Sequence, residues 1–130
     1  MDKTSGVKSI NLTSDQPEAT ARFYREVLEL PIELERHRGT EPHWAGQVGA
    51  LHFAVHPRTG FWLPSATGGA DTVVSFTGAI EPFEARFAAH GVPITARTRI
   101  GPMSFIAVRD PDGRHVCIGT PWPERGHAAR

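Results

Sequence analysis

The order of secondary-structure elements predicted from the sequence occurs twice, and this repeat limits the possible folds more than any other feature. A strand, a helix and three more strands are predicted over residues 7–56, and the same order returns over residues 71–120. Ala-Arg-Phe at residues 21–23 recurs at 85–87, and Leu-Pro-Ile at 30–32 recurs as Val-Pro-Ile at 92–94. A period of about 64 residues is too long for a solenoid repeat, so it indicates a duplicated module.

Strict alternation of apolar and polar residues predicts the strands. In residues 7–13, Ile10 and Leu12 fall on one face while Ser9 and Asn11 fall on the other, which is the pattern of a half-buried strand. The remaining strands are expected at 32–38, 43–48, 50–56, 71–77, 92–100, 103–110 and 114–120.

Two segments change to a helical period. In residues 14–30 the apolar positions Ala19, Phe23, Val27 and Leu30 recur at helical spacing. Ser14 or Asp15 is the expected N-cap, Pro17 fits the first turn and Pro31 is expected to stop the helix. The second helix is expected over residues 80–91, with Gly91 as its stop.

Length and composition favour one domain and argue against two classes of partner. The 130 residues suit a single domain of two modules, 7–56 and 71–120, joined by a linker at 57–70 and followed by a polar tail at 121–130. Equal numbers of basic and acidic residues, 14 of each, argue against nucleic acid or a membrane as the partner. One cysteine and no signal-peptide pattern predict a cytoplasmic protein.

Two stretches carry a resemblance to a known superfamily. Residues 9–32, SINLTSDQPEATARFYREVLELPI, and the hairpin at 105–119, FIAVRDPDGRHVCIG, resemble the opening and closing segments of vicinal oxygen chelate proteins. Members include glyoxalase I, extradiol dioxygenases and bleomycin-resistance binding proteins. The resemblance implies an α+β fold in which two βαβββ modules form paired curved sheets around a central cavity, and it implies a homodimer.

The resemblance also places four positions where metal-using members have His, Glu or Gln ligands. These positions hold Ser9, His52, Asp71 and Cys117. A serine hydroxyl is a poor ligand for a divalent metal, so no metal site is favoured. If a metal such as zinc, nickel or iron binds, the expected ligands are His52, Asp71 and Cys117.

Strand parity predicts which side chains line the cavity. Because Val116 and Ile118 should face a helix, His115 and Cys117 should face the cavity. The predicted ligand-binding residues are Ser9, Asn11, His52, Asp71, Met103, Phe105, His115 and Cys117.

Several of these residues have alternative roles. His52 is either a general base or part of the pocket wall, and it is the one candidate catalytic residue. Cys117 is either a small packed side chain or a nucleophile, and Asp71 either faces the cavity or caps a solvated loop. His56, at a strand end before Pro57, is expected at the rim.

The favoured function is binding of an apolar or aromatic small molecule without a catalytic metal. Two alternatives stay open at this point. One is a glyoxalase-like lyase, isomerase or dioxygenase that uses a non-standard metal site or His52 as a base. The other is a non-catalytic interaction domain.

Overall fold

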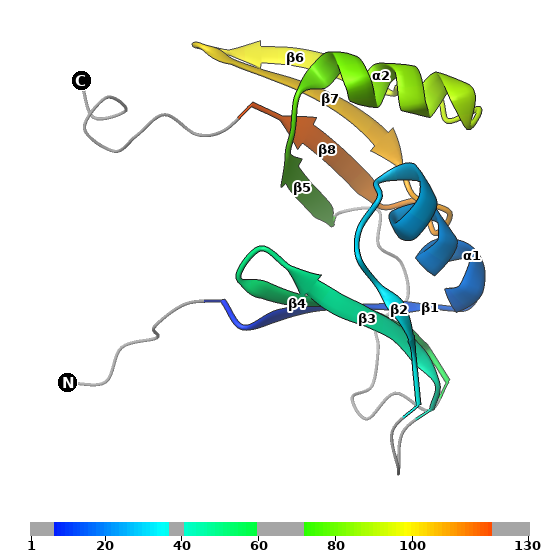
Figure 1. Cartoon of the computed structure of the whole chain (residues 1–130). Helices are drawn as coiled ribbons and strands as arrows, with labels where there is room; N and C mark the ends of the chain where they lie inside the picture. Colours follow the sequence, from blue (N-terminus) through cyan, green and yellow to red (C-terminus); the bar gives the residue numbers. More distant parts are fainter. Residues whose placement is uncertain (1–6, 37–40, 60–71, 121–130) are drawn as a thin grey trace, which may run out of the picture. The chain divides into compact units, whose positions relative to one another are not determined.

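A computed structural model of the chain describes residues 7–36, 41–59 and 72–120. Its contacts divide the chain into two compact units, Met1–Thr67 (unit 1) and Gly68–Arg130 (unit 2). Each unit has one four-stranded sheet and its own helical segment, so the chain is α+β as predicted (Figure 1). Most of the predicted linker and all of the predicted tail lie outside the described residues.

The two units repeat the same order of elements. Unit 1 contains β1 (Ser9–Ser14), α1 (Pro17–Arg22), the π-helical turn η1 (Phe23–Val27), β2 (Glu33–Glu35), β3 (His43–Val48) and β4 (Leu51–Pro57). Unit 2 contains β5 (Val73–Thr77), α2 (Ile80–Ala89), β6 (Ala96–Ile100), β7 (Met103–Arg109) and β8 (His115–Gly119).

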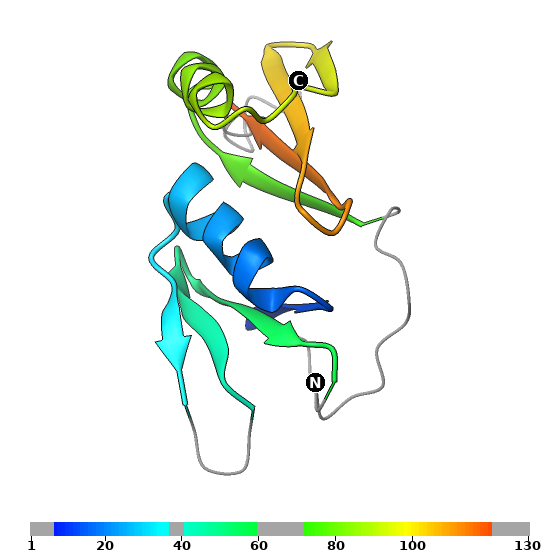
Figure 2. The ribbon, with the colours of Figure 1, turned by 90° about the vertical axis from the view of Figure 1, so that its right-hand side faces the viewer.

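The two sheets also share one topology. The strand orders are β1-β4-β3-β2 and β5-β8-β7-β6, and in each sheet the first strand of the unit runs parallel to the last. A parallel pair requires a crossover connection, which begins with the helical segment that packs on one face of the sheet (Figure 2). The duplicated module predicted from the sequence is therefore confirmed.

In unit 1, apolar side chains fill the space between the helical segment and the sheet. Leu12, Phe53 and Val55 are buried, and the ring of Phe53 lies 5.1 Å from that of Tyr24 in η1. The chain leaving η1 then crosses β3 so closely that a Cβ at Gly46 would overlap the Pro31 carbonyl. Gly46 is required there because the two backbones touch.

The first helix starts later than predicted. Its N-cap is Gln16, which makes no side-chain capping bond, so the assignment of Ser14 or Asp15 as the N-cap is wrong. The Ser14 hydroxyl instead accepts a hydrogen bond from the Gln16 N–H at 2.9 Å. Pro17 occupies the first turn as expected, but Ala19 is exposed because the buried stripe begins at Thr20.

The first helix also ends earlier than predicted. Helical hydrogen bonding stops at Leu28, and Glu29 takes a left-handed φ of 56°. The chain has thus left the helix before it reaches Pro31, so Pro31 is not the residue that stops it. The strand that follows is the short β2, which covers only part of the predicted 32–38.

In unit 2, α2 covers the face that carries Ile106, Val108, Val116 and Ile118, all of which are buried. Phe87 of α2 is fully buried. The helix ends before Gly91, whose φ of 68° suits glycine, as predicted. No helix in the part of the chain that the structure describes is long and apolar enough to span a membrane.

Candidate functional site

The sheet face of unit 1 that lies opposite the helical segment carries a cluster of polar side chains. Register places Ser9 of β1 beside His52 of β4, and His52 beside Gln47 of β3. Two residues further along, Asn11 and Ala54 are neighbours, and at the far end of the sheet His56 lies next to Thr13. We call this surface the polar face of unit 1 and define it by Ser9, Asn11, His43, Gln47, His52 and His56.

Hydrogen bonds join three of these side chains. The Asn11 amide Nδ2 donates to Ser9 Oγ at 3.1 Å. Because the amide nitrogen is turned to Ser9, Asn11 Oδ1 is left as the acceptor for His56 Nε2 at 3.0 Å. His56 therefore carries its proton on Nε2 when its ring is neutral.

A second histidine extends this network towards the edge of the sheet. The rings of His43 and His56 stack with centroids 4.6 Å apart and planes inclined by 24°. His43 is buried, and its Nδ1 lies 3.0 Å from the Glu41 carbonyl oxygen. Its Nε2 lies 3.6 Å from Glu35 Oε1 of β2, so the network crosses all four strands.

The setting of His56 opposes a positive charge on its ring. Burial lowers the pKa of His56 to about 4, and the nearby positive charges of His43 and then His52 act in the same direction. His56 therefore remains neutral at physiological pH. It can donate a hydrogen bond and stack, but it does not supply a charge.

The sheet of unit 2 has its own face opposite α2. Val116 and Ile118 of β8 are fully buried beneath α2, and His115 and Cys117 point to the opposite side. The predicted alternation of β8, with Val116 and Ile118 on the helix side, is confirmed. Cys117 is half-buried, with Ser75 and Ala107 as its neighbours on the adjoining strands.

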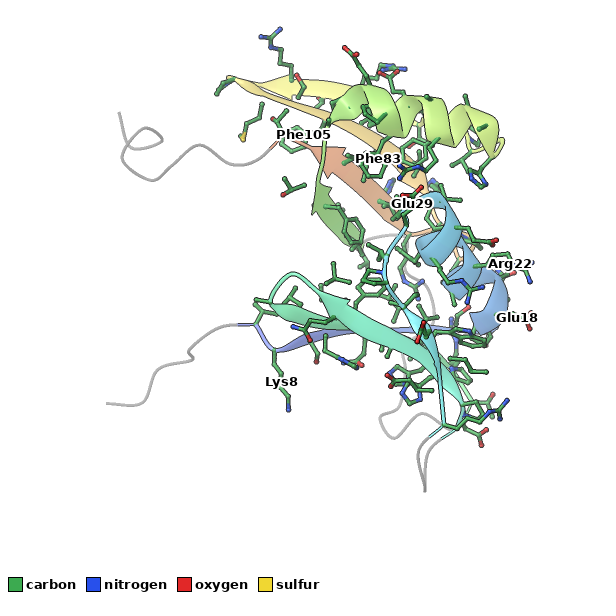
Figure 3. All side chains as sticks on the ribbon, in the orientation of Figure 1. Lys8, Glu18, Arg22, Glu29, Phe83 and Phe105 are labelled. Carbon is green, nitrogen blue, oxygen red and sulfur yellow. The ribbon has the colours of Figure 1, made fainter. Side chains whose placement is uncertain are left out.

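The side chains of Phe105 and Met103 point to the same side of β7 as that of Ala107. Phe105 lies directly opposite Gly119, where a Cβ would overlap its ring, so the missing side chain at Gly119 makes room for the aromatic ring. Phe105 also lines a groove of about 300 Å³ that reaches β6 and the start of α2. Figure 3 labels Phe105, which belongs to β7, and Phe83, which belongs to α2.

The predicted site residues thus divide between two faces. Ser9, Asn11 and His52 lie together on the polar face of unit 1, and Phe105, His115 and Cys117 lie on the corresponding face of unit 2. Met103, with the same parity, is buried. Asp71 lies outside the described residues. That all eight residues line one cavity stays a prediction.

Three of the four predicted metal-ligand positions, Ser9, His52 and Cys117, lie among the described residues. Among residues 7–36, 41–59 and 72–120, no group of three His, Cys, Asp or Glu side chains is placed to hold a metal ion. At the first ligand position, the Ser9 hydroxyl already accepts a hydrogen bond from Asn11.

The sequence interpretation missed the importance of two histidines. His43 was not identified, and His56 was assigned to the rim, although the structure places both in the polar network. One signal was available in the alternation of β3, where His43, Ala45 and Gln47 share a face. Pairing of this strand with β4 would have brought His43 next to His56.

Comparisons with known proteins give a likeness of structure only. No protein-family profile matches the chain, and no curated protein sequence matches it. TnmS3, an antibiotic binding protein from Streptomyces sp. CB03234, superimposes with a TM-score of 0.73 and 16% identity, covering 94% of this chain and 100% of that one. Lactoylglutathione lyase from Agrobacterium tumefaciens superimposes with a TM-score of 0.69 and 18% identity, covering 92% of this chain and 96% of that one.

An integron cassette protein from the mobile metagenome of V. cholerae superimposes with a TM-score of 0.71 and 19% identity, covering 94% of this chain and 99% of that one. These matches span nearly the whole chain and agree with the repeated topology described above. The chain has the vicinal oxygen chelate fold. The likeness is one of fold, and the polar face of unit 1 is a candidate site because of its hydrogen-bonded side chains.

Proposed function

We propose that this protein, which has the vicinal oxygen chelate fold, binds an apolar or aromatic small molecule on the polar face of unit 1, without a catalytic metal. The observation that carries the proposal is the fixed arrangement of Ser9, Asn11 and His56 across adjacent strands. Ordered polar groups on rigid strands can orient a ligand, and aromatic rings supply contact area. The antibiotic-binding description of TnmS3 supports the same class of function.

The face of unit 2 that lies opposite α2 is proposed as a further ligand-contacting surface. It combines an aromatic ring, Phe105, with the imidazole of His115 and the thiol of Cys117. This mixture of an apolar ring and a few polar groups is typical of small-molecule sites. We also propose that the protein is a homodimer, which sedimentation equilibrium will test.

A thermal-shift screen with planar aromatic antibiotics and glutathione hemithioacetals tests the binding proposal. A compound that binds the folded state stabilises it by RT ln(1 + [L]/Kd), so the melting temperature rises with the ligand concentration. We expect at least one aromatic antibiotic to do so. If no compound raises the melting temperature, small-molecule binding is rejected and the interaction-domain alternative is favoured.

A double variant, Asn11→Ala with His52→Ala, then locates the site. It should lower affinity for any compound found in the screen by about tenfold or more, since each lost polar contact to a ligand is worth about 1 kcal/mol. His90→Ala is the matched control because His90 lies at the end of α2 in unit 2. An equal loss of affinity in both proteins would contradict the assignment to the polar face.

A further inference from the structure

Two hydrogen bonds on the polar face of unit 1 run in the same direction and end at Ser9. His56 Nε2–H donates to Asn11 Oδ1 at 3.0 Å, and the Asn11 amide Nδ2–H donates to Ser9 Oγ at 3.1 Å. A hydroxyl oxygen that accepts such a bond becomes a stronger donor through its own hydrogen. Within the described part of the chain no group accepts the Ser9 hydroxyl hydrogen, so this donor is open to a ligand.

The neighbouring strand places a second donor beside Ser9. His52 of β4 is the register neighbour of Ser9, and its side chain is only half-buried. The His52 ring makes no hydrogen bond to any residue in the ranges 7–36, 41–59 and 72–120. An imidazole carries at least one N–H in each of its protonation states, so His52 can donate to the same ligand group as Ser9.

A positive charge lies next to these two donors. Lys8 directly precedes Ser9, and Figure 3 shows its side chain on the side of the unit 1 sheet that faces away from α1, which is the side of the polar face. Lys8 is exposed and forms no ion pair with a described residue. Two N–H or O–H donors beside an ammonium group are the surroundings that an oxyanion prefers.

The carboxylates around the polar face lie far from this end of the sheet. Three strand spacings of about 4.8 Å separate β1 from β2, so the carboxylates of β2 lie about 14 Å away across the sheet. At that distance, exposed charges are largely screened at physiological salt. Two further carboxylates lie at the opposite end of the face, beyond the end of β1 and before the start of β3. The residues of these two groups are Glu33 and Glu35 on β2, and Asp15 and Glu41 at the far end.

We propose that Ser9, His52 and Lys8 form a carboxylate-binding subsite, and that the ligand of the polar face is therefore an aromatic acid. This inference rests on the proposed binding function and names the class of its ligand. The Ser9 hydroxyl and a His52 N–H donate to the carboxylate oxygens, while Lys8 balances the charge. One lysine matches the single charge of a carboxylate better than the nearly double charge of a phosphate monoester.

Three probes with one ring system test the subsite by titration calorimetry at pH 7. They are 2-naphthoate, the neutral 2-naphthamide and the cationic 2-naphthylmethylammonium ion. We expect 2-naphthoate to bind at least about tenfold more tightly than the other two, because its hydrogen bonds are charge-assisted. Its affinity should also decrease between low and high NaCl concentration, while that of 2-naphthamide stays constant.

The outcomes separate this inference from the proposed function. Equal or tighter binding of 2-naphthamide or the ammonium probe overturns the carboxylate subsite and leaves small-molecule binding standing. If none of the three probes binds, the subsite is rejected, and the thermal-shift screen decides the binding function separately.

Two substitutions locate the subsite. Ser9→Ala should weaken 2-naphthoate binding by about tenfold, and Lys8→Gln by about threefold, since an exposed ion pair contributes less than a charge-assisted hydrogen bond. Lys8→Gln should leave 2-naphthamide binding unchanged. Arg25→Gln is the matched control because Arg25 is an exposed cation in η1, on the helical side of unit 1. Equal losses in Lys8→Gln and Arg25→Gln, or an equal loss of both probes in Lys8→Gln, would overturn the proposal.

Discussion

At the scale of single residues, His56 links the polar face to the stability of the fold. Its pKa is about 4 in the folded protein, against 6.5 for an ordinary histidine. The unfolded chain therefore binds a proton that the folded chain does not. The stability contributed by neutral His56 is complete above about pH 6.5 and decreases as the pH falls towards 4.

This linkage predicts a measurable loss of stability on acidification. Urea unfolding at pH 7 and at pH 4 should show a loss from His56 of about 1–2 kcal/mol, which is discounted because the ring is partly exposed to solvent. His56→Gln removes the titrating ring, so the stability of this variant should decrease less between pH 7 and pH 4. His90→Gln should keep the wild-type slope, and a His56→Gln slope equal to that of wild type would contradict the assignment.

Two glycines provide a second test at this scale. Gly46→Ala places a Cβ against the Pro31 carbonyl, and because the obstacle is backbone, we expect a loss of about 3 kcal/mol in the free energy of unfolding. Gly119→Ala places a Cβ against the Phe105 ring, which can rotate away at smaller cost. Denaturant unfolding that finds Gly119→Ala the more damaging of the two would contradict the packing described here.

The sequence predicted which side of each strand a residue occupies, because alternation alone decides this. Ser9, Asn11 and His52 lie on the face opposite the helical segment of unit 1, as alternation predicts, and His115 and Cys117 lie on the corresponding face of unit 2. That these faces line a cavity stays a prediction. The stacking of His43 on His56 could not be predicted in the same way, since it depends on the register between β3 and β4 and on ring orientation. The proximity of Glu35 depends in turn on the pairing of the short β2.

At the scale of elements, the turn between β7 and β8 is held by one buried carboxylate. Asp110 Oδ1 accepts the N–H groups of Asp112 and Arg114 at 2.9 and 3.0 Å, and Oδ2 pairs with the Arg114 guanidinium at 3.0 Å. The side chains of Asp110 and Arg114 are 0% and 8% exposed. The Asp-Pro-Asp-Gly sequence therefore has a structural role that fixes the hairpin carrying Cys117.

Removal of this carboxylate should be strongly destabilising. Asp110→Ala removes a fully buried carboxylate that bonds two backbone N–H groups and the Arg114 guanidinium, which keeps Asp112 at 3.1 Å, and we expect a loss of about 3 kcal/mol in chemical denaturation. Glu18→Ala is the comparison, because Glu18 forms an exposed ion pair with Arg22 on α1 (Figure 3) and should cost at most about 1 kcal/mol. A similar cost for both substitutions would show that the buried pair does not hold the turn.

Helix boundaries were predicted less well than strands. The apolar spacing indicated one helix that ends at Pro31, whereas the chain forms a short α-helix, a π-helical turn and a left-handed residue at Glu29. The Leu30 N–H bonds to the Tyr24 carbonyl at 3.0 Å, which closes this end of the segment. Such an ending depends on tertiary packing over β3, which periodicity does not reveal.

At the scale of the whole molecule, the duplicated module was predictable because both copies retain the same order of strands and helix. The sheets β1-β4-β3-β2 and β5-β8-β7-β6 follow from that order and from the need to cross over between parallel strands. The ligand was not predictable to the same degree, since the vicinal oxygen chelate fold serves both metal enzymes and binding proteins.

Metal analysis of protein purified without a histidine tag tests the function at this scale. A serine hydroxyl is a poor ligand for a divalent metal, and Ser9 Oγ already accepts a hydrogen bond from Asn11, so we expect zinc, nickel and iron at well below one equivalent per chain. One equivalent of any of these metals, retained after dialysis, would instead favour the enzymatic alternative.

The central claim is that the polar face of unit 1 binds an apolar or aromatic small molecule, and NMR of the bound protein tests it most directly. The side-chain amide of Asn11 and the rings of His52 and His56 should shift together as an aromatic antibiotic found in the thermal screen is added. Their shifts should follow a single saturating curve, while His90 stays unchanged. Saturable binding that leaves all three of these side chains unaffected would contradict the account.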